Sequence, residues 1–329
     1  MTFLNRNYTS FLKALFVALL VGLLGNTLVL AQDRASSDSD YVIFVSNRTG
    51  TTELFLLDLK SAQVSQLTDT GRGKITPATA ANARVAAFAS REGSSYELFT
   101  AQLSSTWRTR RPVLAAVNRL TINTLEETNP TLTADGLTMA FSSSGKIEMM
   151  KFDGQGRQEL VAVDNNSNVA PAISPNGKWV AFMSNRSGAN ELWLVDTNTR
   201  ELRQLTKNSG VIGGLNWSAD SQRIVFTTTA TTSKLTGIAL AEVATGAFQL
   251  VTEAGDGEAA ISPDGSRMVF TSNRSGDPEL YLLNLNTNAV QRLTNNPGPD
   301  GSATFISAPA DTLRRTPPSR QVTLRGQNQ

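Results

Sequence analysis

Histidine and cysteine, which supply many of the nucleophiles, general bases and metal ligands of proteins, are both absent from this sequence of 329 residues. Without histidine a Ser-His-Asp triad cannot form, and the imidazole and thiolate ligands of transition-metal sites are missing. No disulfide can form either. We therefore expect neither catalysis nor a bound cofactor, and the chemistry that remains belongs to charged and polar side chains.

Four arginines recur in closely similar surroundings. Arg48, Arg186 and Arg274 each end a Ser-Asn-Arg triplet four residues after a phenylalanine, and Arg91 follows a phenylalanine by three residues. One interpretation is a ring of guanidinium groups that binds a partner on one face. The alternative, which the repetition favours, is that each arginine pairs with an acid or a carbonyl group of its own or the next repeat.

A second set of residues occupies one position of the same repeat but varies in residue type. Loop residues that vary on a rigid scaffold usually determine its binding specificity. Asp256 and Asp300 belong to consecutive repeats, and two carboxylates brought close together repel unless a cation or a basic group lies between them. A hard cation such as Ca²⁺, which prefers oxygen ligands, is one hypothesis, and an ion pair with Lys74 is its competitor. Solvated loop charges are the third interpretation. The full set is Lys74, Glu127, Asn168, Ile212, Asp256 and Asp300.

The overall charge gives no general attraction for nucleic acid or anionic lipid. The chain has 30 basic and 28 acidic residues, and residues 1–31 contain two of the basic ones and no acid, so 28 of each remain beyond them. Trp107 with Arg108, Arg110 and Arg111 forms a basic, aromatic cluster that nucleic acid or an anionic glycan could contact. We interpret this cluster as a solvated insertion loop and expect no nucleic-acid partner.

The elements that position these residues follow from an internal repeat. Nearly the same stretch occurs three times, and three weaker copies share its phenylalanine, so we expect six units. Successive phenylalanines are 44, 53, 41, 44 and 44 residues apart. Eleven residues before each of the last five stands a residue that marks the innermost strand of its unit, which we call the landmark. The strong copies are VSNRTGTTELFLLDL (45–59), MSNRSGANELWLVDT (183–197) and TSNRSGDPELYLLNL (271–285); the phenylalanines are Phe44, Phe88, Phe141, Phe182, Phe226 and Phe270; the landmarks are Pro77, Pro130, Pro171, Leu215 and Ala259.

Each unit contains four short runs of strand-forming residues separated by turn residues. In the fourth unit these runs are 172–174, 179–183, 191–196 and 203–206. A repeat of about 40–45 residues with four strands is typical of a propeller blade. We therefore expect an all-β chain folded as a six-bladed β-propeller of four-stranded antiparallel blades. A C-terminal strand at 302–306 would close the ring by completing the first blade.

The most regular unit carries a family resemblance. Its segments AISPDG (260–265), MVF (268–270), SNRSG (272–276), LY (280–281) and LT (293–294) resemble the WD40-like (PD40) repeats of the TolB propeller. The resemblance covers about residues 41–307 and does not include the separate α/β domain that precedes the propeller in TolB. It implies an exported six-bladed propeller that meets other envelope proteins, with Pal-like lipoproteins as the family's example.

The N-terminus has the pattern of an export signal. Arg6 and Lys13 are followed by an apolar run of eleven residues at 14–24, which fits a signal peptide better than a membrane-spanning helix. The alternative is an uncleaved anchor, the one route by which we expect contact with a membrane. We expect a signal peptide at 1–31, a short linker at 32–40, the propeller at 41–307 and a flexible basic tail at 308–329 of a periplasmic or extracellular protein.

These expectations lead to two hypotheses of function. The first is a TolB-like propeller that acts as a protein–protein interaction or scaffold module in the cell envelope, with an envelope protein or a Pal-like lipoprotein as its partner. The second is a propeller that binds a small ligand, a glycan or a cation at the mouth of its central channel. An apolar patch on one face would favour the first hypothesis, and polar groups converging on the channel mouth would favour the second.

Overall fold

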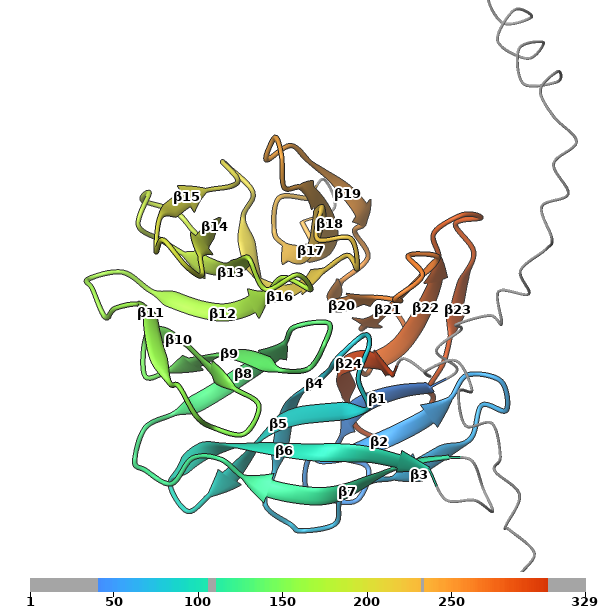
Figure 1. Ribbon diagram of the computed structural model, residues 1–329. Coiled ribbons are helices and arrows are strands. Elements are labelled where there is room, and N and C mark those ends of the chain that lie inside the picture. Colours follow the sequence, from blue (N-terminus) through green and yellow to red (C-terminus); the bar gives the residue numbers. More distant parts are fainter. Residues whose placement is uncertain (1–40, 106–110, 232–233, 307–329) are drawn as a thin grey trace, which may run out of the picture. The chain divides into compact units, whose positions relative to one another are not determined.

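The computed structural model describes residues 41–105, 111–231 and 234–306, which form six four-stranded antiparallel sheets (Figure 1). The sheets follow one another as the blades of a six-bladed propeller, so the expected all-β fold and blade number are confirmed. Within the described residues no helix is long and apolar enough to cross a membrane.

Several sequence predictions lie outside the described residues. They are the signal peptide at 1–31, the linker at 32–40, the tail at 308–329 and all but Arg111 of the cluster that begins at Trp107.

Five blades consist of consecutive strands, whereas blade 1 joins the two ends of the described chain. From the innermost strand outwards, blade 1 is β24 (Asp300–Ile306), β1 (Tyr41–Ser46), β2 (Glu53–Asp58) and β3 (Val64–Gln66); blade 2 is β4 (Lys74–Thr79), β5 (Val85–Glu92), β6 (Ser95–Ser105) and β7 (Pro112–Arg119); blade 3 is β8 (Glu127–Leu132), β9 (Thr138–Ser143), β10 (Lys146–Lys151) and β11 (Gln158–Val161); blade 4 is β12 (Asn168–Ile173), β13 (Trp179–Ser184), β14 (Glu191–Asp196) and β15 (Leu202–Gln204); blade 5 is β16 (Val211–Trp217), β17 (Arg223–Thr228), β18 (Gly237–Glu242) and β19 (Phe248–Thr252); blade 6 is β20 (Asp256–Ile261), β21 (Arg267–Ser272), β22 (Glu279–Asn284) and β23 (Val290–Arg292).

The last strand closes the ring as the sequence predicts. β24 pairs antiparallel with β1, with Tyr41 opposite Ile306 and Val42 opposite Phe305. It also packs against the inner strands of blades 2 and 6, β4 and β20. This pairing covers an edge of β1 that would otherwise present unpaired backbone groups.

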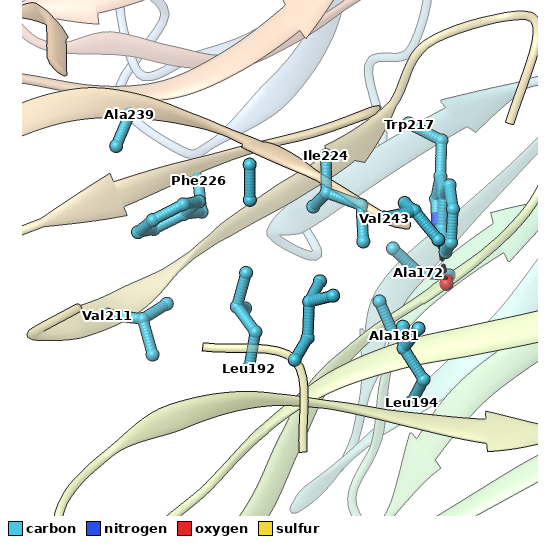
Figure 2. Close-up of a cluster of buried hydrophobic side chains, with 12 residues drawn as sticks. Ala172, Ala181, Leu192, Leu194, Val211, Trp217, Ile224, Phe226, Ala239 and Val243 are labelled. Carbon is cyan, nitrogen blue, oxygen red and sulfur yellow. Dashed lines mark hydrogen bonds between the residues drawn. The ribbon is translucent and has the colours of Figure 1, made fainter. Parts of the chain in front are cut away.

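Buried apolar side chains fill the spaces between neighbouring blades in six clusters. Figure 2 shows the cluster between blades 4 and 5, where Leu192 of β14 packs with Ile224 and Phe226 of β17. Trp217 of β16 belongs to the same cluster, and its indole N–H donates to the carbonyl of Ala172 at 2.8 Å. Every blade therefore depends on its neighbours to bury its apolar faces.

The repeated phenylalanines occupy equivalent positions on the second strands, and their exposed fractions lie between 0% and 2%, so the prediction of one buried ring per blade is confirmed. Opposite each of them the inner strand has a β-bulge: two of its residues face one phenylalanine. The second residue of each bulge is the landmark of the sequence in five blades and Ala303 in blade 1. The first residue of each bulge has a left-handed backbone conformation. These first residues are Thr76, Asn129, Ala170, Gly214, Glu258 and Ser302, with φ of 49°, 53°, 52°, 62°, 50° and 49°.

Candidate functional site

Both sets of candidate binding residues lie on one face of the propeller, which we call the entry face. It is formed by the hairpins between second and third strands and by the loops that lead into the inner strands. Arg274, in such a hairpin, ion-pairs with Asp256 at the start of β20, with 2.6 Å between Nη2 and Oδ2. Arg48 reaches Asp300 at the start of β24 in the same way, at 2.8 Å. The turns between first and second strands form the opposite face, the turn face.

Three of the four repeated arginines are held inside their own blades. Arg186 donates from Nη2 to Asn168 at 2.7 Å and from Nε to Ser184 at 3.1 Å. Arg48 and Arg274 are bound in the same manner by a serine and by the aspartate of their blade. Each guanidinium also lies over the repeated phenylalanine and a third-strand aromatic ring, between 4.9 and 5.5 Å from the ring centroids. The pairing interpretation therefore describes these three residues.

Blades 2 and 3 depart from this pattern. Arg91 is exposed and lies over the ring of Tyr96 at 5.8 Å, and among the described residues it forms no ion pair. In blade 3, Arg157 takes the place of the missing repeated arginine: it pairs with Glu127 at 2.6 Å and lies 5.1 Å from the centroid of Phe141. Arg157 comes from the segment before β11, a position that the repeat does not mark, so sequence reasoning missed it.

The polar candidate residues of the channel mouth are buried and individually paired. No hydrogen bond or ion pair within the described residues joins any two of Lys74, Glu127, Asn168, Asp256 and Asp300. Because each aspartate has its own arginine, the electrostatic reason for expecting a cation between Asp256 and Asp300 does not hold. In the described part of the chain there is also no cluster of three or more acidic residues that could hold a metal ion. Ile212, the apolar member of the set, is 46% exposed.

Lys74 belongs to a buried arrangement that the sequence analysis did not identify. It lies 3.8 Å from Glu53 of the neighbouring blade, whose carboxylate accepts hydrogen bonds from Thr68 and from the backbone of Thr70 and Gly71. Burial raises the pKa of Glu53, but these hydrogen bonds and the charge of Lys74 outweigh it, so the pKa is lowered overall. The Glu–Thr contact recurs as Glu191–Thr206 at 2.8 Å and Glu279–Thr294 at 2.5 Å. The sequence signal was a glutamate fifteen residues before the threonine of the Leu-Thr pairs at 67–68, 205–206 and 293–294.

A cavity of about 250 Å³ occupies the central channel and is lined by the inner strands of all six blades. It reaches the turn face, where Pro175 and Pro263 contribute to its wall. A second cavity, of about 310 Å³, lies towards the entry face between blades 5 and 6. Gly214 and Glu258 line both cavities, and Glu258 is the single ionisable side chain among the described residues that line the first.

The entry face also carries exposed apolar side chains. Ile122 and Val163, in the loops leading into β8 and β12, are 80% and 58% exposed, and Leu235 in the hairpin before β18 is 52% exposed. Together with Leu125 and Ile212 we call these residues the apolar arc; they come from the part of the entry face that runs from the end of blade 2 to blade 5.

Comparisons with known proteins agree with this architecture, although no family model matches the chain. The chain is 31% identical over 129 residues to a TolB homologue of Chlorobium chlorochromatii, covering 39% of this chain and 29% of that protein. It is 26% identical over 141 residues to the Tol-Pal system protein TolB of Francisella tularensis, covering 43% and 32%. The matched segments thus span about a third of these curated relatives.

Among solved structures, TolB from Acinetobacter baumannii superposes with a TM-score of 0.66 at 18% identity, covering 80% of this chain and 66% of that one. An oligogalacturonate lyase in complex with manganese has the same fold at a TM-score of 0.50 and 14% identity, covering 75% and 86%. The propeller fold alone therefore does not separate binding proteins from enzymes. The chain is thus similar to TolB proteins in part of its sequence and in its six-bladed propeller fold.

Proposed function

We propose that this chain is an exported protein–protein interaction module of the cell envelope, periplasmic or extracellular, which binds its partner through the entry face. One relative is named as a Tol-Pal system protein, so a Pal-like lipoprotein is the partner class to test first. The observation that carries the proposal is the apolar arc.

The carboxylates at the start of three inner strands offer little to a partner. Asp256, Asp300 and Glu127 are already paired with arginines. Ile122, Val163 and the other members of the arc are exposed and lie on the same face, where one partner can cover several of them. A partner that buries the arc would gain from the hydrophobic effect.

The proposal includes no catalytic activity. Glycosidic bond hydrolysis uses two carboxyl groups in most enzyme families, and the described lining of the central cavity holds one. The sequence has no histidine or cysteine, so imidazole and thiol groups are not available for acid–base or nucleophilic catalysis.

A charge placed in the apolar arc tests the proposal. The double variant Ile122→Lys/Val163→Lys should weaken partner binding about tenfold or more, because burying an unpaired ammonium in an interface is costly. Leu137→Lys is the matched control, since Leu137 is 66% exposed on the turn face.

The measurement is capture of envelope proteins on the immobilised chain, followed by calorimetric titration with a purified Pal-like lipoprotein of the same organism. Equal binding by the wild type, the double variant and the control would contradict the role of the arc. The absence of any captured envelope protein would contradict the function itself.

A further inference from the structure

Glu258 differs from the five residues at the equivalent position of the other blades. All six are the first residues of the inner-strand bulges, and all six line the central cavity. The others are threonine, asparagine, alanine, glycine and serine, so the ring of bulges carries a single charge. Glu258 is also exposed, and holding a non-glycine residue in the left-handed region costs of order 1 kcal/mol or more.

The carboxylate of Glu258 is held in place by blade 1 and by its own blade. Its Oε2 accepts the backbone N–H of Ser302 at 2.8 Å and the hydroxyl of the same residue at 3.3 Å. Thr271 Oγ1 lies 3.5 Å from the same oxygen, and the backbone N–H of Glu258 donates to Thr227 at 2.9 Å. Oε2 is therefore the oxygen that these contacts hold, whereas Oε1 accepts no hydrogen bond among the described residues.

No positive charge of the described chain compensates this carboxylate. Neither cavity that Glu258 lines contains a lysine or an arginine within the described residues, and Glu258 forms no ion pair there. Asp256 lies two residues earlier in β20, and Arg274 already occupies it. The channel therefore holds one uncompensated negative charge in a fixed orientation.

The size and lining of the cavity limit what can bind. About 250 Å³ is several times the space that one water molecule needs, and it lies below the roughly 300–1,000 Å³ of sites for drug-sized ligands. Pro263, Leu215 and Phe305 give its wall apolar surface beside the polar bulges. A Ca²⁺ ion takes 6–8 oxygen ligands, usually from several carboxylates, whereas one carboxylate matches one monovalent cation.

We propose that the central channel binds a primary ammonium group on a short aliphatic chain, with the ammonium on Oε1 of Glu258 and the aliphatic chain against the apolar wall. This site is distinct from the apolar arc and does not depend on the envelope partner. The ammonium can come from a free alkylamine or from a lysine side chain of a peptide that enters the channel.

Titration followed by NMR spectroscopy tests the proposal on the isotope-labelled full chain at neutral pH. The probes are n-butylamine and the capped peptide Gly-Gly-Lys-Gly-Gly; their neutral counterparts are n-butanol and the peptide with glutamine in place of lysine. Saturable shifts of the Glu258 and Ser302 amide signals are expected with the ammonium probes only. Binding of the amine alone identifies a free amine as the source, and binding of the peptide identifies a lysine side chain.

Glu258→Gln should weaken binding of the ammonium probes about tenfold or more, because a charge-assisted hydrogen bond is lost while the amide oxygen still accepts from Ser302. Glu201→Gln removes the same charge from an exposed turn of blade 4 and should leave binding unchanged. Equal binding by the Glu258→Gln variant, or equal shifts with the neutral probes, overturns the proposal. Saturable binding of CaCl₂ without binding of the amines overturns it in favour of a metal site. If Glu258→Gln does not fold, the comparison of ammonium and neutral probes on the wild type still decides.

Discussion

At the scale of single residues, the aspartates that begin the inner strands of blades 1 and 6 are paired with arginines, whereas Glu258 in the ring of bulges forms no ion pair within the described residues. The sequence places Asp256 and Asp300 at one position of consecutive blades, and a shared cation is one of the hypotheses that this placement allows. The arginines that neutralise them were also visible in the sequence, and the repetition of Arg48 and Arg274 favoured pairing within the fold. What the sequence did not reveal was which acid each arginine meets, because that depends on which loops share a face.

Removing one member of such a pair should be costly. Arg274→Ala leaves the fully buried carboxylate of Asp256 without its partner, so we expect a loss of about 2–4 kcal/mol in the free energy of unfolding. Urea-induced unfolding followed by circular dichroism measures it. Arg91→Ala is the control and should change the stability by about 0.5 kcal/mol or less, because Arg91 is exposed and has no ion pair in the described structure. Similar losses in both variants would show that Arg274 acts through packing alone.

The buried phenylalanines give a second prediction at this scale. Phe182→Ala should lower the free energy of unfolding by about 3–5 kcal/mol, since Phe182 is 0% exposed in the cluster between blades 3 and 4. Leu202→Ala in the same blade is 40% exposed and should cost much less. Equal effects in the same denaturant titration would mean that the six rings do not form the core.

At the scale of elements, the bulge of the inner strand explains the spacing of the repeat. Two residues of each inner strand face one phenylalanine, so the landmark and the phenylalanine stay at a fixed distance in sequence. Such a bulge re-aims the side chains around it, and the simple alternation of a strand no longer tells which residues point into the channel. The bulge places Glu258, which directly precedes the landmark, in the lining of the channel, a position that the alternation of a regular strand does not predict.

The closing strand gives a prediction at the same scale. Deleting residues 300–329 removes β24, exposes the backbone edge of β1 and should cause aggregation, which size-exclusion chromatography with light scattering detects. Deleting only 312–329 keeps β24 and should leave a monodisperse, folded chain. Unfolding of the shorter deletion would mean that the expected tail is part of the folded structure.

At the scale of the whole propeller, the sequence predicts what every blade shares and not what one blade does alone. The six units, their strand order and the closure by β24 all follow from features that recur. Because the copies can be aligned with one another, a clear copy shows how a weaker one folds. Arg157 and Glu258 are departures from the repeat, and a single copy offers no neighbour against which to compare them. The inferred ammonium site in the channel therefore depends on Glu258, a residue that the repeat does not mark.

The pairing of β24 with β1 has a consequence for the order of events during biosynthesis. A chain emerging from a ribosome or an export pore makes β1 first and β24 last, and blade 1 cannot be completed until residues 300–306 have appeared. Until then the nascent chain carries an incomplete first blade with an open edge, which a chaperone or a neighbouring chain can engage. Ring formation is thus delayed until translation or translocation has delivered the final strand.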